Sequence, residues 1–125
     1  MTMKLLLIDD DAFLRDMYAI KFGDSGYEVS VADSAAAGLT ILERSPDFDV
    51  VLLDMIMPGM TGVELIRAIH EQFPDSKAKC IVLSNQGQPE DIKEAIEAGA
   101  VGYIIKAESV PSDVVKKVEA LANES

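Results

Sequence analysis

The stretch DVVLLDMIMPG at residues 49–59 places four consecutive aliphatic residues, Val50–Leu53, directly before a carboxylate, Asp54. An unbroken apolar run of this length indicates a strand that is buried on both faces. A carboxylate at the end of such a strand is costly to bury without a partner. A second run of the same kind, LLLI at residues 5–8, is followed by three aspartates at residues 9–11. The two runs therefore predict one acidic pocket, at the edge of the sheet where both strands end.

The length and composition are those of one folded domain. A chain of 125 residues, of which 49% are hydrophobic, can bury a substantial core and is too apolar to be disordered. No internal repeat or linker divides the sequence. We therefore expect residues 1–125 to form a single domain, with no effector domain attached.

Charge and hydropathy indicate where the protein is located and which classes of partner it does not bind. The chain carries 22 acidic and 11 basic residues, a net charge of −11, and has no basic stripe, so we expect no direct binding to nucleic acid. Its apolar runs are far shorter than the ~20 residues of a membrane span, and its first residues do not resemble a signal peptide. The single cysteine, Cys80, lies in an apolar run and is expected to be buried. A cytoplasmic protein that does not enter the membrane is the expected class.

Five short apolar runs alternate along the chain with five segments that have the apolar spacing of amphipathic helices. The runs predict strands at Lys4–Ile8, Glu28–Ala32, Val50–Leu53, Cys80–Leu83 and Val101–Ile105. The first helix is expected over residues 12–23. Ser34 and Thr61 suit the N-caps of the second and third helices, while Pro89 and Pro111 suit the first turns of the fourth and fifth.

Strict alternation of strands and helices predicts an α/β fold with a parallel sheet and helices on both of its faces. We expect the flavodoxin-like, doubly wound (βα)5 arrangement, with a five-stranded parallel sheet in strand order 2-1-3-4-5. In such folds ligands bind beyond the carboxyl ends of the strands, where the strand order reverses. The residues that end four of the strands should therefore meet there: Asp9, Asp10, Asp54, Ser84 and Lys106.

This set of side chains suits phosphoryl transfer. Packed carboxylates repel one another unless a cation or a proton intervenes, and their oxygen atoms are ligands that Mg²⁺ prefers. A carboxylate such as that of Asp54 can accept a phosphoryl group as an acyl phosphate. The phosphoryl oxygens then need positive charge and hydrogen-bond donors, which Mg²⁺, Lys106 and the Ser84 hydroxyl can supply.

Four stretches of the sequence each include the end of a predicted strand: residues 5–11, 49–62, 82–84 and 98–106. In that order, these four stretches resemble the bacterial response-regulator receiver domains of two-component signal transduction, and the chain is similar to chemotaxis regulators in particular. The similarity spans essentially the whole chain. Any one stretch would be a weak signal, but the four together are very specific.

The resemblance implies a role for each carboxylate. Asp54 would be the phosphoacceptor, taking its phosphoryl group from the phosphohistidine of a sensor histidine kinase or a phosphotransfer protein. Asp10 would bind Mg²⁺ directly and Asp9 mostly through water, with the carboxylate of Asp54 and the backbone carbonyl of Ile56 as further ligands. Such a protein is not an enzyme in the usual sense, because it catalyses only its own phosphorylation and dephosphorylation.

The resemblance also implies a switch. Ser84 and Lys106 would hold the phosphoryl oxygens, and Tyr103 would be the aromatic residue that rotates inward when Ser84 moves. The face formed by the fourth helix, the fifth strand and the fifth helix would then bind a downstream protein whose identity the sequence does not give. A homodimer that forms on phosphorylation is an alternative output.

Three positions depart from the usual family pattern. Ala107 follows Lys106 where the family usually has proline, often after a cis bond; a cis bond before alanine costs about 2.5–4 kcal/mol, so we predict a trans bond. Asn85 stands where alanine is usual and is expected to affect access of the phosphoryl group. Ile56 and Gln86 occupy positions that influence the attacking water in this family. The apolar Ile56 cannot orient that water, which predicts slow self-dephosphorylation.

Two other classes of function remain open at this stage. A receiver-like scaffold would bind proteins without being phosphorylated, but the complete set of site residues argues against it. A flavodoxin-like cofactor protein would need a phosphate-cradling loop rich in glycine, serine or threonine after the first strand. The three aspartates at residues 9–11 would instead repel a nucleotide phosphate.

Overall fold

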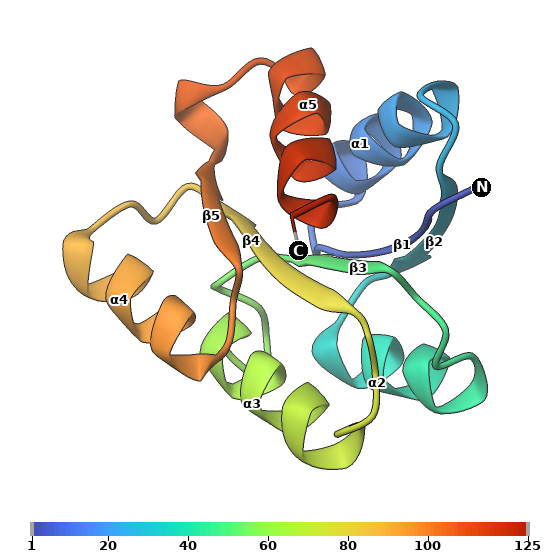
Figure 1. Ribbon diagram of the computed structural model, residues 1–125. Helices are drawn as coiled ribbons and strands as arrows, with labels where there is room; N and C mark the ends of the chain where they lie inside the picture. Colours follow the sequence, from blue (N-terminus) through green and yellow to red (C-terminus); the bar gives the residue numbers. More distant parts are fainter. Residues whose placement is uncertain (1, 125) are drawn as a thin grey trace.

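Five parallel strands form the central sheet of the computed structural model, which describes residues 2–124 (Figure 1). Their bounds are β1 Lys4–Ile8, β2 Glu28–Ala32, β3 Val50–Leu53, β4 Lys79–Ser84 and β5 Gly102–Ile105. The strand order is β2-β1-β3-β4-β5, and every neighbouring pair is parallel. The predicted fold class and strand order are confirmed.

The strand bounds differ from the predicted ones at two strands. β4 is one residue longer at each end, because Lys79 pairs with Val50 of β3 and Ser84 pairs with Ile105 of β5. β5 begins at Gly102, one residue later than predicted. The extension of β4 places Ser84 inside the sheet, so backbone pairing holds this residue.

Helices cover both faces of the sheet (Figure 1). Their bounds are α1 Ala12–Asp24, α2 Ala35–Arg44, α3 Gly62–Gln72, α4 Pro89–Ala98 and α5 Pro111–Ala122. α1 and α5 lie on one face, and α2, α3 and α4 lie on the other. A short 3-10 helix, η1 Lys106–Glu108, was not predicted. Among the described helices, none is long and apolar enough to cross a bilayer.

The helix starts follow from local chemistry. The side chains of Asp11 and Ser34 accept hydrogen bonds from backbone N–H groups in the first turns of α1 and α2. Thr61 and Glu64 form a complete capping box at α3, in which each side chain accepts from the other residue's backbone N–H. Pro89 and Pro111 are the first residues of α4 and α5, as predicted.

The strands alternate their side chains between two hydrophobic cores. Leu5 and Leu7 of β1 face the core under α1 and α5, whereas Leu6 and Ile8 face the core under α2, α3 and α4. All four are essentially inaccessible to solvent, as the unbroken apolar run predicts. Cys80 is buried in the second of these cores, and burial raises the pKa of its thiol to about 12.

Lys79, at the start of β4, holds the end of α5. Its Nζ atom donates hydrogen bonds to the carbonyl oxygens of Leu121, at 3.3 Å, and Ala122, at 3.2 Å, and also to the carbonyl of Glu124. The last carbonyls of a helix have no partner within the helix and carry partial negative charge, so an ammonium group stabilises them. One side chain thus ties α5 to the edge of the sheet opposite the carboxyl ends of the strands.

We expect Lys79→Met to lower the free energy of unfolding by about 1–2 kcal/mol, because it leaves these carbonyls without the charged donor. Lys77→Met is the matched control. Lys77 lies two residues earlier and forms an exposed ion pair with Asp49 at 3.2 Å, so its loss should change stability by less than about 1 kcal/mol. Urea unfolding of both variants measures the difference. Equal losses would show that Lys79 does not anchor α5.

Candidate functional site

Lys106 joins the carboxyl ends of three strands. Its Nζ atom lies 2.8 Å from Oδ2 of Asp9, which follows β1, and 3.1 Å from Oδ2 of Asp54, which follows β3. Lys106 itself follows β5 directly, and β4 separates it from β3 in the sheet. The lysine stem therefore spans the end of β4 to reach both carboxylates, and the ammonium group relieves their repulsion.

The carboxylates of Asp9, Asp10 and Asp54 form a group that could hold a metal ion. One oxygen atom of each lies within 4.8 Å of the others. Asp9 is buried, Asp54 is half-buried and Asp10 is exposed, so the group opens to solvent on one side. Three carboxylates outweigh the one ammonium group, which leaves formal charge for a divalent cation. An all-oxygen donor set of this kind fits Mg²⁺, which usually retains several water ligands.

Asp9 is held by the first turn of α1. Its Oδ1 atom accepts the Asp11 backbone N–H at 2.9 Å, and its backbone carbonyl accepts from the Arg15 guanidinium at 2.9 Å. The buried Tyr18 also lies close enough for the charges on Lys106 and Asp9 to act on its hydroxyl. Sequence reasoning missed Arg15 and Tyr18. No spacing in the sequence indicates these contacts, because Asp9 lies before the first residue of α1.

The loop after β3 holds Asp54 through backbone contacts. The Ile56 N–H donates to Oδ1 of Asp54 at 3.3 Å, and the Ile56 side chain is 60% exposed. Gly62, the first residue of α3, donates its N–H to the Met55 carbonyl at 2.8 Å. A Cβ atom on Gly62 would lie 2.6 Å from the Asp54 carbonyl oxygen and 2.8 Å from Cα of Met55. Only glycine allows α3 to approach this loop so closely.

Ser84 lies at the end of β4 and is 1% exposed. Its Oγ atom accepts the Gln86 backbone N–H at 3.1 Å, and the Gln86 carbonyl accepts the hydroxyl proton of Tyr103. The Tyr103 ring is half-buried and packs against the core under α4. Gln86 thus connects the two residues that the sequence predicts as the switch.

Lys106 remains charged in this setting. Burial favours its neutral form, but the hydrogen bond with Asp9 and the charges of Asp54 and Asp9 outweigh burial and raise the pKa of its ammonium group. The side chains of Lys106, Asp9 and Asp54 are 7%, 3% and 14% exposed, so solvent screens these charges weakly. The ion pairs are therefore a fixed feature of the site over the neutral pH range.

The departures predicted around the site have different outcomes. Every peptide bond between the described residues is trans, including Lys106–Ala107, as predicted. The chain then enters the 3-10 helix η1. Asn85 is exposed. Its influence on phosphoryl access stays a prediction, as does the Ile56 carbonyl as a metal ligand.

A comparison of the sequence with models of protein families identifies the family of this chain. The sequence model of the response regulator receiver domain matches residues 5–119. The chain belongs to this family. Receiver domains are signalling domains of two-component systems and not classical enzymes.

Individual relatives fall into two groups. The chain is 38% identical to the chemotaxis protein CheY of Thermotoga maritima over 120 residues, which cover 94% of this chain and 93% of that protein. It is 32% identical to the phosphate regulon transcriptional regulatory protein PhoB of Pseudomonas aeruginosa over 118 residues, 94% of this chain and 50% of that protein. The chain therefore spans about half the length of PhoB and of similar DNA-binding relatives.

Solved structures agree with this assignment. A CheY-like receiver domain protein from Methanospirillum hungatei superimposes with a TM-score of 0.88 at 29% identity, over 98% of this chain and 95% of that one. The chemotaxis response regulator CheY4 of Vibrio cholerae superimposes with a TM-score of 0.86 at 28% identity, over 97% and 99% of the two chains. The flavodoxin-like arrangement here is thus that of receiver domains.

The close approach at Gly62 gives a test of how the site is held. Gly62→Ala should destabilise the protein by about 1–3 kcal/mol, because the methyl group collides with backbone atoms that cannot turn aside. Gly23→Ala is the control, since a Cβ atom on Gly23, in the last turn of α1, meets nothing within 4 Å. That substitution should be neutral or should stabilise the protein by up to about 1 kcal/mol. Thermal unfolding distinguishes the two, and a stable Gly62→Ala protein would contradict the model of a tight loop.

Proposed function

We propose that Asp54 is the phosphoacceptor of a two-component response regulator. The observation that carries this proposal is the position of its carboxylate: half-buried, 3.1 Å from the Lys106 ammonium group and grouped with the carboxylates of Asp9 and Asp10. A carboxylate that served only to stabilise the fold would not need two further carboxylates beside it. Phosphoryl transfer needs this combination, because positive charge must be gathered around a nucleophile that is itself negative.

In the proposed reaction an oxygen atom of Asp54 attacks the phosphorus atom of a phosphohistidine on a sensor kinase or phosphotransfer protein. The P–N bond breaks, the imidazole leaves with the bonding electrons and takes up a proton, and an acyl phosphate forms on Asp54. Lys106 contacts one Asp54 oxygen, and it would hold a phosphoryl oxygen in the proposed reaction. Mg²⁺ bound by Asp9, Asp10, Asp54 and the Ile56 carbonyl would supply further positive charge to the phosphoryl oxygens.

The same proposal assigns a switch to Ser84 and Tyr103. A phosphoryl group on Asp54 would attract the Ser84 hydroxyl, which now accepts the Gln86 N–H. Because the Gln86 carbonyl also accepts from Tyr103, movement of Ser84 would shift Gln86 and change the position of the tyrosine ring. The face formed by α4, β5 and α5 would then change shape for a downstream protein or a second copy of the chain.

The proposal also covers the kind of downstream partner that the domain binds. The receiver-domain model matches residues 5–119, and the relatives divide between the CheY proteins and longer regulators such as the transcriptional regulator PhoB and the DNA-binding regulator MtrA. We propose that this domain acts through protein contacts and not by binding nucleic acid itself, in keeping with its net charge of −11.

Incubation with Mg²⁺ and acetyl phosphate tests the phosphoacceptor. Intact-mass measurement should show the gain of one phosphoryl group in the wild-type protein and no gain in Asp54→Asn, which lacks the nucleophilic carboxylate. Asp16→Asn, on the exposed side of α1, is the matched control and should be phosphorylated like the wild type. Omission of Mg²⁺ should abolish the gain. No gain in the wild type with acetyl phosphate or a phosphorylated kinase would favour the scaffold that binds proteins without phosphorylation.

The acyl phosphate should be long-lived. The exposed side chain of Ile56 lies on the loop that follows Asp54. This side chain is apolar and has no hydrogen-bond donor or acceptor that could orient an attacking water molecule. Ile56→Asn should therefore shorten the half-life of the phosphorylated protein, measured by loss of the phosphoryl group after removal of the donor. Ile20→Asn changes an exposed isoleucine of α1 in the same way and should have no effect. A wild-type half-life of only seconds at neutral pH would contradict this prediction.

A further inference from the structure

A groove opens between the loop after β3, the first turn of α3 and the side of α4. Its volume is about 360 Å³. Ile56 and Val63 provide exposed and half-exposed aliphatic surface within it. The Ile56 side chain is 60% exposed, which is high for an isoleucine on a loop whose neighbours are buried. When a partner covers an exposed apolar side chain in a concave site, apolar surface leaves water and the free energy of the complex is lowered.

The charges around the groove all have the same sign. Glu64 lines it from α3, and Asp91 and Glu94 line it from α4. The hydrogen bonds from the Thr61 backbone lower the pKa of Glu64, so this carboxylate is ionised at neutral pH. None of the described residues that line the groove is basic. The groove is therefore lined by aliphatic side chains and by three carboxylates, those of Glu64, Asp91 and Glu94, which we call its rim.

We propose that this groove binds a basic segment of a partner protein, in which an aliphatic side chain flanked by lysine or arginine residues covers Ile56. The aliphatic group would remove apolar surface of Ile56 and Val63 from water. The flanking cations would pair with Glu64, Asp91 and Glu94. Charge complementarity of this kind sets the choice of partner and speeds association. A nucleic acid or an acidic peptide would be repelled by the same rim.

The groove also contacts the predicted switch. Gln86 lines it, and the backbone of Gln86 donates to Ser84 and accepts from Tyr103. Burial raises the pKa of the Tyr103 hydroxyl, and the negative charge of the nearby Asp91 raises it further. A segment seated in the groove would therefore touch Gln86, which connects Ser84 and Tyr103, the two residues proposed to move when Asp54 is phosphorylated. This coupling rests on the proposed function, whereas the docking itself depends only on the shape and charge of the groove.

The test uses the peptide acetyl-Lys-Lys-Leu-Lys-Lys-amide and the full chain, with binding followed by amide NMR titration at low salt. The expected result is saturable shifts at Ile56, Val63, Gln86 and Glu94. A peptide with serine in place of leucine keeps the charge and should bind more weakly. Equal binding of the two peptides, or shifts spread over the acidic surface, would overturn the proposal by showing only general attraction to a negative protein.

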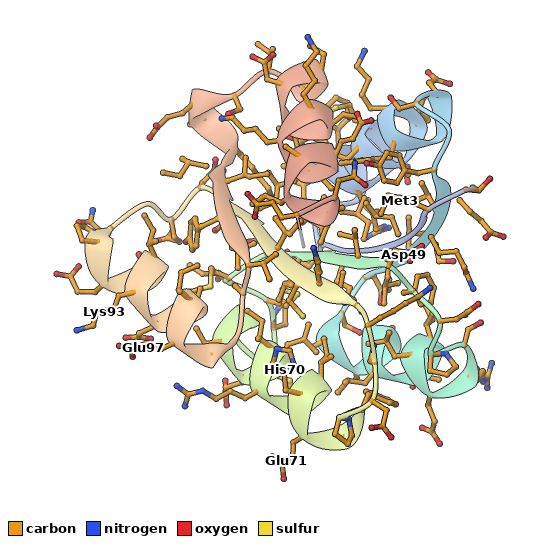
Figure 2. The ribbon with its side chains drawn as sticks, viewed as in Figure 1. Met3, Asp49, His70, Glu71, Lys93 and Glu97 are labelled. Carbon is orange, nitrogen blue, oxygen red and sulfur yellow. The ribbon has the colours of Figure 1, made fainter. Side chains whose placement is uncertain are left out.

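Two charge reversals on α4 form the matched pair. Glu94→Lys should weaken binding about tenfold, since it removes one rim charge and adds a repulsive one. Glu97→Lys makes the same change at a residue that projects from α4 outside the groove (Figure 2), and it should leave affinity nearly unchanged. Equal weakening by both would overturn the docking site. Both variants should still be phosphorylated by acetyl phosphate, so failure of the groove is distinguishable from failure of the phosphoacceptor.

The titration is repeated with the wild-type protein after addition of Mg²⁺ and beryllofluoride, with Asp54→Asn as the control. Coupling through Gln86 predicts a change in peptide affinity in the wild type and none in Asp54→Asn. An unchanged affinity, in a protein whose Asp54 region shifts on addition of beryllofluoride, would overturn the coupling and leave the docking site standing.

Discussion

The two ion pairs of Lys106 are the contacts on which the site depends. Asp9 and Asp54 directly follow two runs of fully buried aliphatic residues, residues 5–8 of β1 and residues 50–53 of β3. Without a cation between them, Asp9 and Asp54 would repel each other in a weakly screened environment. The ammonium group at 2.8 Å and 3.1 Å removes that repulsion and draws the ends of β1, β3 and β5 together. The site is therefore part of what holds this edge of the sheet.

Opposite ends of the sheet carry different kinds of contact. At the carboxyl ends of the strands, acidic groups and one lysine form a polar site that is open to solvent. At the other end, Lys79 donates to the last carbonyls of α5, and the side chain of Asp49, which is labelled in Figure 2, accepts the backbone N–H of Lys4 at 2.8 Å. The first set of charges is accessible from solvent on the side of Asp10. The second set satisfies backbone groups and fixes the positions of elements.

Most of the fold could be predicted because the local signals agree with one another. The apolar runs, the caps at Ser34 and Thr61 and the prolines at positions 89 and 111 all favour the same element bounds. The 3-10 helix at Lys106–Glu108 could not be predicted, because three residues carry no periodicity and the family pattern is broken at Ala107. The extension of β4 to Ser84 depends on pairing with β5, which no local signal reveals.

The site was predicted as a set of residues but not as a geometry. Strand-end positions indicated that Asp9, Asp54 and Lys106 would meet, and they do. Contacts that depend on the approach of two elements could not be predicted from the sequence. Examples are the hydrogen bond from Arg15 to the Asp9 carbonyl and the close packing of Gly62 on the loop that follows Asp54. Such contacts follow from how a helix docks on the sheet, and no spacing in the sequence specifies that docking.

The unequal exposure of the three carboxylates has a kinetic consequence. Solvent reaches Asp10 freely, Asp54 partly and Asp9 hardly at all, so the group of carboxylates is exposed on the side of Asp10. In the proposed function, an ion and a phosphorylated donor would both approach the site from this exposed side. A donor protein seated over it would block later entry of an ion, which makes the order of arrival matter. Productive encounters are then those in which the ion is already in place.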